Sequence, residues 1–152
     1  MQIQFLFFKI MEQTLVIIKP GAVRRELIGE IIKRFERKGL KLCGLKMLQL
    51  DDSLLDEHYA HLQQKPFFQE IKNSMMACPV VVCCWAGEGC VRIVREMTGK
   101  TDPCDAATGT VRGDFGMSIR DNVIHSSDST ENAKIELVRF FKPDEIFLHI
   151  TN

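Results

Sequence analysis

The sequence predicts an α+β fold, and three observations lead to this prediction. Two continuous apolar runs rich in β-branched residues, Thr14–Ile18 and Val80–Trp85, are typical of strands buried on both faces. Between them, Ile28–Lys38 carries apolar residues at helical spacing. Strand and helix patterns therefore mix along a chain of 152 residues, which is long enough for one ordinary domain with a substantial core.

The N-terminal part predicts a strand, a helix and a second strand. The strand Thr14–Ile18 must break at Lys19-Pro20-Gly21. The helix Ile28–Lys38 follows and has Gly39 at its C′ position, where glycine commonly ends a helix. Leu40–Leu50 then alternates as a strand, with a slip of phase near Gly44 that suggests a β-bulge.

The middle of the chain predicts two further helices, from Asp51 to about His61 and from Pro66 to about Met76, ahead of the strand Val80–Trp85. A helix from about Glu88 to Thr98 follows this strand. The stretch Gly99–Ser118 is turn-rich and has no clear periodicity over most of its length. A loop this long inside a compact domain is expected to be functional.

The last part predicts a short strand that runs into His125 and a helix over Ser129–Phe141. Asp128 and Glu131 have the spacing of a capping box at the start of this helix. His125 thus stands just before a helix N-terminus, where anions are favoured. A single histidine at such a turn is more often structural than catalytic, so the rest of the chain must decide its role.

The predicted order is β-α-β, two helices, β-α, a long loop and β-α. Its β-α-β-β-α-β core describes a ferredoxin-like antiparallel sheet covered by helices, with extra helices and a long loop before the last strand. An open flavodoxin-like sheet is the alternative, but it would need more strands. We expect residues 11–152 to form this single domain. Residues 1–10, too short to span a membrane and unlike a signal peptide, are expected to be an N-terminal extension.

Composition narrows the possible partners. Lys+Arg and Asp+Glu both total 20, so the formal net charge is zero. A neutral chain without basic runs is unlike a general nucleic-acid or membrane binder, although one local basic pocket remains compatible with it. The six cysteines form no CxxC pair and no zinc-finger spacing. Reduced thiols in the cytoplasm are therefore expected.

Side chains rather than a glycine-rich loop would have to bind phosphate, since neither GxxxxGK[ST] nor GxGxxG occurs. Arginine offers a planar, permanently charged fork for phosphate oxygens, and threonine offers a neutral donor. The candidates are Lys19, Arg95, Thr101 and Arg112. Arg112 stands between Gly109 and Gly113, which would let backbone approach a ligand closely.

Two other features have competing explanations. His58 and His61 lie three residues apart on a predicted helix and could begin a metal site, but no third ligand follows at a convincing spacing. An exposed helix face is the better interpretation. Phe67-Phe68 after Pro66 could stack on a base, or could simply fill the core.

These motifs together resemble the nucleoside diphosphate kinase family over about residues 13–147. The segments that carry the resemblance are TLVIIKP (14–20), IGEIIKRFE (28–36), EHYAHL (57–62), PFF (66–68), GTVRGDF (109–115) and NVIHSSDS (122–129). So many motifs in the right order and at the right spacing make a chance match very improbable.

The resemblance implies a ping-pong transfer of the γ-phosphoryl group from a nucleoside triphosphate to a nucleoside diphosphate, with His125 as the nucleophile. It also implies Mg²⁺ bound through the nucleotide phosphates, with no metal-binding residue of its own, broad base specificity, and a tetramer or hexamer built from dimers. The implied catalytic residues are His125, Glu136, Ser127, Tyr59 and Lys19. The implied nucleotide-binding residues are Lys19, Phe67, Arg95, Thr101, Arg112, Ile119 and Asn122.

The family picture assigns these residues distinct roles. Tyr59 would lie against the histidine, while Glu136, helped by Ser127, would orient its imidazole. Phe67 and Ile119 would sandwich the base. A catalytically weak or inactive nucleotide-binding module on the same fold is the alternative, although such a module would be expected to have lost some of these residues.

Four places depart from the usual family pattern: Gly21-Ala22 where Asp-Gly or Asp-Ala is common, Asp102 where Asn is frequent, Arg120-Asp121 where Gly-Arg is common, and Ser126 where glycine follows the nucleophile. We expect Asp121 to place a negative charge near the phosphate site and so to weaken nucleotide binding. The Cβ and hydroxyl of Ser126 are expected to affect backbone freedom beside His125.

Overall fold

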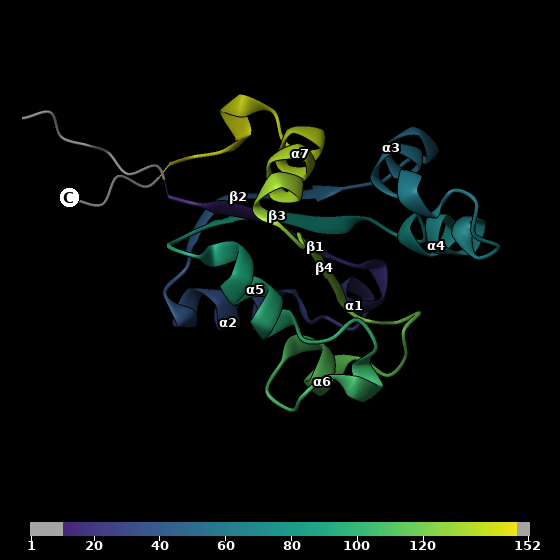
Figure 1. Cartoon of the computed structure of the whole chain (residues 1–152), viewed down its shortest axis with the longest axis horizontal. Helices are drawn as coiled ribbons and strands as arrows, with labels where there is room; N and C mark the ends of the chain where they lie inside the picture. The colour runs from purple at the N-terminus through teal and green to yellow at the C-terminus, as the bar shows by residue number, and fades with distance from the viewer. Residues whose placement is uncertain (1–10, 149–152) are drawn as a thin grey trace, which may run out of the picture.

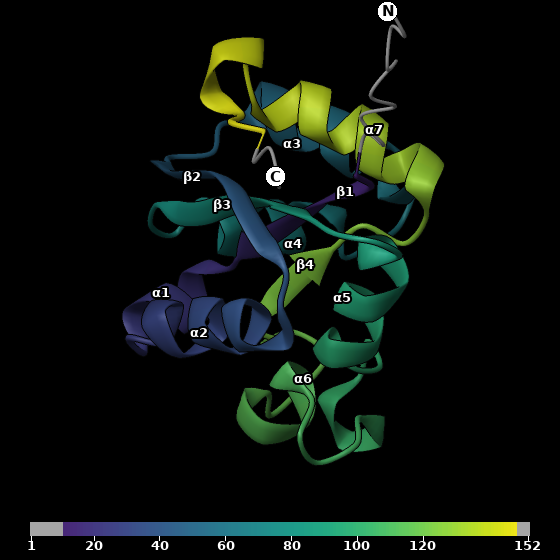
Figure 2. The same ribbon diagram turned by 90° about the vertical axis from the view of Figure 1, so that its left-hand side faces the viewer.

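The computed structural model describes residues 11–148 as a four-stranded antiparallel sheet with helices on both faces (Figure 1, Figure 2). The strands are β1 (Gln13–Ile18), β2 (Lys41–Leu48), β3 (Val80–Ala86) and β4 (Ile124–Ser126). They lie in the order β2-β3-β1-β4, and every neighbouring pair is antiparallel. The ferredoxin-like prediction is confirmed.

The two apolar runs form the centre of the sheet, as predicted. β1 pairs with β3 along its whole length, and the side chains of both strands alternate between two separate cores. Cys83 contributes to one core and the adjacent Cys84 to the other, as successive strand residues should. All six cysteines are free thiols.

Helices cover both faces of the sheet. The first core lies beneath α1 (Pro20–Arg24), α2 (Ile28–Lys38), α5 (Cys90–Thr98) and α6 (Val111–Phe115). The second lies beneath α3 (Asp52–His58), α4 (Phe68–Met75) and α7 (Thr130–Phe140). Figure 2 shows α3 and α7 above the sheet and α2, α5 and α6 below it. Short 3₁₀ turns lie at Ala60–Leu62, Pro103–Asp105 and Pro143–Glu145.

Local sequence signals explain most of these boundaries. α2 has the predicted bounds, and Gly39 ends it with a left-handed φ of 102° that glycine adopts without steric cost. The register of β2 against β3 shifts between Leu42 and Gly44, so the predicted bulge is confirmed.

Several predicted boundaries were wrong. The helix from Asp51 ends at His58 rather than His61, because the chain tightens into a 3₁₀ turn. Pro20 does break β1, but it also begins α1, since its fixed φ suits the first helical position. The long loop contains α6, whose N-cap Thr110 accepts a hydrogen bond from the Gly113 amide.

The start of α7 also differs from the prediction. Its N-cap is Ser129, whose hydroxyl accepts from the Asn132 amide at 3.1 Å. Asp128 instead accepts from the Asn132 side chain. The capping box of Asp128 and Glu131 was therefore wrong by one residue, because a serine suited to the cap lies directly after the aspartate.

Two further points concern the ends of the chain and the membrane. The predicted extension, residues 1–10, lies outside the described residues. Met11, the first residue of the predicted domain, packs against the second core. Among residues 11–148, none of the helices combines the length and the apolar character needed to cross a bilayer.

Candidate active site

A cleft of about 1,070 Å³ collects nearly all the predicted site residues. The residues that line it are spread along the chain from Lys19 to Arg139 and come from helices on both faces of the sheet. Ten of the eleven predicted residues line it: Lys19, Tyr59, Phe67, Arg95, Thr101, Arg112, Ile119, Asn122, His125 and Glu136. The cleft is large enough for a nucleotide-sized ligand.

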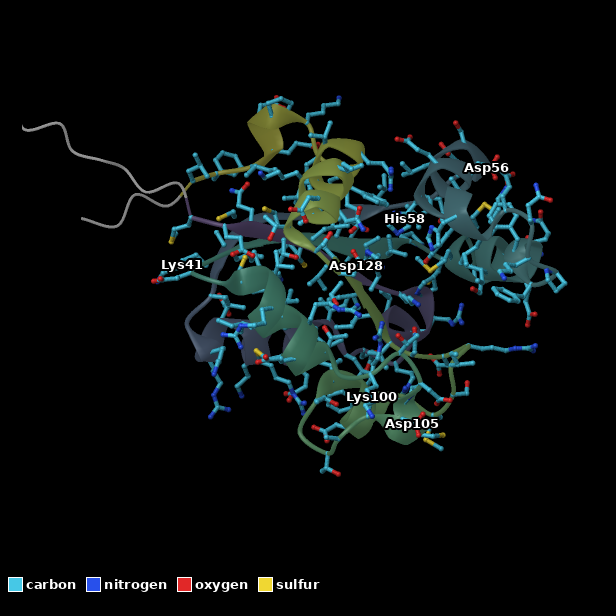
Figure 3. All side chains as sticks on the ribbon, in the orientation of Figure 1. Lys41, Asp56, His58, Lys100, Asp105 and Asp128 are labelled. Carbon is cyan, nitrogen blue, oxygen red and sulfur yellow. The ribbon has the colours of Figure 1, made fainter. Side chains whose placement is uncertain are left out.

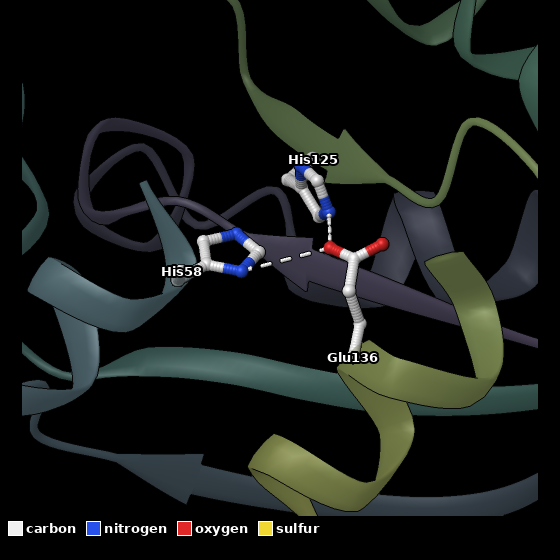
Figure 4. A group of neighbouring side chains, drawn as sticks. All are labelled: His58, His125 and Glu136. Atoms are coloured by element: carbon white, nitrogen blue, oxygen red, sulfur yellow. Dashed lines mark hydrogen bonds and ion pairs between the residues drawn. The ribbon is translucent and has the colours of Figure 1, made fainter. Parts of the chain in front are cut away.

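His125 lies in the middle of β4, opposite Ile17 of β1. Residues directly opposite each other in an antiparallel pair point to the same face, and Ile17 belongs to the second core, so His125 faces α7. Its Nε2 makes a short hydrogen bond to Oε2 of Glu136, two turns into α7 (Figure 4). Figure 4 shows the other ring nitrogen, Nδ1, on the side of the ring away from Glu136. With Nε2–H donating to the carboxylate, Nδ1 keeps its lone pair.

His58 does not lie on an exposed helix face, so that interpretation was wrong. The residue is 6 % exposed, and its ring packs edge-on against His125 with centroids 4.7 Å apart. Figure 3 shows it toward the interior, whereas Asp56 of the same helix lies on the outer side. Burial, followed by the nearby charges of His125 and Arg139, lowers the pKa of His58 to about 2. His58 is therefore neutral.

The hydrogen bonds of His58 fix its tautomer. Arg139 donates from Nη1 to His58 Nδ1 at 3.0 Å, so the ring proton is on Nε2. Glu136 Oε2 lies 3.6 Å from the same Nδ1. Ligand atoms of His58, His125 and Glu136 all lie within 4.8 Å of one another. Because Arg139 occupies Nδ1 and adds a positive charge there, this trio suits hydrogen bonding better than cation binding.

Two residues are placed differently from the family expectation. Tyr59 packs against His58, with centroids 4.7 Å apart, so His58 stands between the tyrosine and His125. The hydroxyl of Ser127 is fully buried and accepts from the Leu15 amide at 3.3 Å. It ties the end of β4 to β1 and does not line the cleft. The expectation that Ser127 helps Glu136 to orient the imidazole stays a prediction, since the contact that its hydroxyl makes is with β1.

Positive side chains converge on the cleft near His125. Lys19 directly follows β1, and its Nζ donates to Asn122 Oδ1 at 2.5 Å. Burial and the charge of Arg112, opposed by Asp121, lower the pKa of Lys19 to about 8. Arg95 donates to the Ser126 carbonyl at 3.3 Å. These groups bring positive charge to the cleft, whose lining also contains carboxylates, although the whole chain is neutral.

Arg112 has a structural task besides facing the cleft. It is 4 % exposed and donates to three carbonyls, those of Gly99, Asn122 and Ile124, at 3.1, 3.1 and 2.7 Å. A guanidinium has five N–H donors, so two remain for a ligand. Burial and the charge of Arg95 lower its pKa to about 10, where it is still a cation at neutral pH.

The glycines around Arg112 have a packing reason rather than a ligand-binding one. A Cβ at Gly113 would lie 2.0 Å from the carbonyl oxygen of Ala107. Gly109 has a φ of 96° and donates from its amide to Asp114. At Gly113 the prediction that backbone approaches a ligand was wrong, because the close neighbour is the chain itself, whereas a Cβ at Gly109 would meet nothing within 4 Å.

Two exposed apolar side chains line another part of the cleft. Phe67 is 42 % exposed and precedes α4, while Ile119 is 58 % exposed and belongs to the loop before β4. Phe67 is thus available to a ligand, whereas its neighbour Phe68 packs against the second core. Beside them, Arg120 forms a 2.8 Å ion pair with Glu70 of α4 and so joins the two segments.

The departures from the family pattern fit one another in space. A Cβ at Gly21 would lie 2.7 Å from Oδ1 of Asp121, so the glycine leaves room for this carboxylate. Arg25 Nη1 lies 4.0 Å from the same aspartate and offsets part of its charge. Ser126 pairs with Val16 on the face opposite His125 and is buried, so its side chain does not touch the imidazole.

Sequence reasoning missed His58 and Arg139. Glu136 lies 3.6 Å from His58, and Arg139 donates to His58. His58 is far from both residues along the chain, so its spacing gives no sign of these contacts. The three-residue interval from Glu136 to Arg139 on α7 was the available signal, because residues three apart share a helix face.

Comparisons with known proteins agree on one family. A family model described as nucleoside diphosphate kinase matches residues 12–146. A nucleoside diphosphate kinase of Parabacteroides distasonis is 59 % identical over 137 residues, covering 90 % of this chain and 90 % of that protein. One of Pyrococcus horikoshii is 54 % identical over 139 residues, covering 90 % and 88 %.

A solved structure agrees with these relatives. The halophilic nucleoside diphosphate kinase from Halobacterium salinarum in complex with CDP superposes with a TM-score of 0.90 at 40 % identity, covering 93 % of this chain and 95 % of that one. Sequence and fold therefore lead to the same group of proteins.

Proposed function

This chain belongs to the nucleoside diphosphate kinase family, and on that premise we propose that it transfers the γ-phosphoryl group of a nucleoside triphosphate to a nucleoside diphosphate through a phosphohistidine at His125. The observation that carries the proposal is the orientation of the imidazole. Glu136 accepts a hydrogen bond from Nε2–H, which leaves the lone pair of Nδ1 free in a cleft whose lining includes Lys19, Arg95 and Arg112.

In each transfer one bond to phosphorus forms and one breaks. Nδ1 attacks the γ-phosphorus, and the bond from that phosphorus to the bridging oxygen of the β-phosphate breaks. The diphosphate leaves with the electron pair, and the resulting positive charge on the ring is stabilised by the Glu136 carboxylate. A second diphosphate then attacks the phosphohistidine by the reverse path. One site can serve both halves, since each half is the other reversed.

The cations are proposed to hold the phosphates in line for this attack. Lys19 and Arg95 face the cleft, and Arg112 has two donors left after binding three carbonyls. Thr101 adds a hydroxyl, and Asn122 an amide, near the same place. Positioning and charge stabilisation supply most of the acceleration in phosphoryl transfer.

The base is proposed to lie between Phe67 and Ile119. Both are exposed in the cleft, and an aromatic ring can stack on any base. Such a contact reads few base edges, so we propose broad base specificity. The nucleoside diphosphate kinase from Halobacterium salinarum binds CDP, which supports nucleotides as the substrate class.

Mg²⁺ is proposed to enter with the nucleotide. Magnesium prefers oxygen ligands, whereas the one compact His/Cys/Asp/Glu group within residues 11–148 offers two histidines. The ion would therefore be held by phosphate oxygens, with the Asp128 carboxylate at the cleft available to a hydration water. The hydrogen bond from Asn132 lowers the pKa of Asp128, so this group is ionised. When bound, Mg²⁺ neutralises phosphate charge.

Organisation beyond the cleft is also a proposal. We propose one domain over residues 11–152, preceded by an extension, in a tetramer or hexamer built from dimers. Leu45 and Met47 of the edge strand β2 are 51 % and 62 % exposed, which supports a contact there. Light scattering distinguishes the two assemblies.

The free thiols support a cytoplasmic location.

Labelling tests the function directly. Incubation with γ-labelled ATP and no acceptor should give an acid-labile, base-stable label that is absent from His125→Ala. His61 is the matched control, because it lines the same cleft but is exposed, and His61→Ala should still be labelled. A folded wild-type protein that binds nucleotide without taking label would instead be the inactive module.

A further inference from the structure

The backbone is strained at Val123, the residue directly before β4. Its φ is 74°, in the left-handed region that β-branched residues almost never occupy. Among the described non-glycine residues the other such case is Glu26, which is exposed at the end of a short helix. Val123, in contrast, is fully buried in the first core.

The strain belongs to a very tight turn. The Ile124 amide donates to the Asn122 carbonyl at 2.8 Å, which closes a three-residue γ-turn around Val123. A γ-turn with positive φ is the rare and costly form. Such strain persists only where the surroundings over-determine it, and it clusters at functional sites.

The turn changes which way the chain points. In a regular strand, residues three apart face opposite sides, so Asn122 and His125 would be separated by the sheet. Both instead line the cleft. Val123 and Ile124 bury their side chains in the same core, which consecutive residues of a regular strand do not do. The turn has therefore shifted the alternation by one residue.

The surroundings hold every carbonyl of the turn. Arg112 donates from Nε to the Asn122 carbonyl at 3.1 Å and from Nη2 to the Ile124 carbonyl at 2.7 Å. The Lys19 amide donates to the Val123 carbonyl at 3.0 Å. Two of the three cations proposed to bind phosphate therefore also fix the turn, Arg112 through its guanidinium and Lys19 through its backbone amide.

We propose that the strained turn at Val123 is a positioning device for phosphoryl transfer, which brings both Asn122 and His125 to the cleft and is held there by Arg112. Val123 is a positioning residue, since its side chain faces the core and not the cleft. This inference rests on the proposed function and deepens it. It also explains why the phosphate-binding arginine is buried: the same group fixes the nucleophile's strand relative to the phosphates.

Comparison of Val123→Gly with Val123→Ala isolates the strain, because both remove the buried branched side chain. Glycine adopts positive φ freely, whereas alanine keeps a Cβ. We expect the folding equilibrium constant of Val123→Gly to exceed that of Val123→Ala by about tenfold. The control is Val81, a buried valine of β3 in the same core, where alanine should be more stable than glycine.

Activity should follow the opposite order. Val123→Gly frees the turn, so labelling of His125 at saturating ATP should be about tenfold or more slower than in Val123→Ala. A merely structural role would make activity follow stability. Unfolding is also measured in saturating ADP, because bound nucleotide stabilises the folded state of a variant that is too unstable to measure without ligand.

Two results would overturn the proposal: Val123→Ala at least as stable as Val123→Gly, or equal labelling rates in the two variants. If the wild-type protein took no label, the proposed function would fail and the positioning role with it. The stability order would still report whether the turn is strained, so the two failures are distinguishable.

Discussion

The titration of Lys19 gives a quantitative prediction for nucleotide affinity. Burial and the charge of Arg112, only partly offset by Asp121, bring its pKa to about 8 from an ordinary value of 10.5. As pH rises through this value in the free protein, the ammonium group is lost, while the nucleotide phosphates are already ionised. If Lys19 binds phosphate as a cation, the affinity must therefore fall above about pH 8.

The size of the effect follows from the fraction of charged lysine. At pH 7 this fraction is close to one, and at pH 9, one unit above the pKa, it is about one in eleven. We therefore expect the Kd of ADP, measured by titration calorimetry, to rise about tenfold between pH 7 and pH 9. A lysine at its ordinary pKa would give almost no change over this range.

Two variants separate Lys19 from other groups. Lys19→Arg keeps its charge throughout this range and should give a nearly flat profile, even if its affinity is lower. Lys65→Arg changes an exposed lysine and should retain the wild-type profile. A wild-type Kd that stayed constant from pH 7 to pH 9.5 would refute the reasoning.

The free energy of unfolding should change in the opposite direction. A folded-state pKa below the unfolded value means that the unfolded chain binds more protons between about pH 8 and pH 10.5. The contribution of Lys19 to stability therefore rises with pH across this window, while nucleotide affinity falls. Chemical denaturation of wild type and Lys19→Arg at both ends of the window tests this, since the arginine variant should lack the rise.

Three further predictions concern other residues of the cleft. Glu136→Gln removes the carboxylate acceptor of His125 Nε2 and should slow labelling by roughly a hundredfold, measured by rapid quench, with little change in ADP affinity. Asp121→Asn should tighten ADP binding about two- to threefold at low ionic strength, and calorimetry in added salt should show the gain disappear. Arg120→Gln breaks the exposed ion pair with Glu70 and should raise the ADP dissociation rate by at most about fivefold in stopped-flow experiments. A double variant that exchanges the two charges, Arg120→Glu with Glu70→Arg, should restore the wild-type rate.

The parts of the fold that could be predicted are those where a local pattern has one physical solution. The continuous apolar runs of β1 and β3 can be buried only in the middle of a sheet, and α2 has both a clear apolar face and a glycine cap. α6 could not be predicted, because its five residues are too few to show a period. The same holds for the exact start of α7, where Asp128 and Ser129 both suit a cap.

In the candidate site, too, some features could be predicted from the sequence and others could not. The motifs identified the residues that face the cleft, because each carries chemistry that a ligand needs. They did not predict how these residues are held, since His58, Arg139 and the carbonyls bound by Arg112 depend on contacts between distant segments. Ser127 illustrates the difference: it is next to the site in sequence, but its hydroxyl bonds to β1.

The site therefore depends on two kinds of support around one histidine. On the α7 side, burial keeps His58 neutral, so its Nδ1 accepts a hydrogen bond from Arg139 while it lies 3.6 Å from the Glu136 carboxylate. On the other side, the turn at Val123 reverses the alternation of the strand and is held by Arg112. A histidine in an ordinary strand would have neither support. The sequence around His125 looks like a simple strand end, whereas the backbone of Val123, just before that strand, departs from strand geometry.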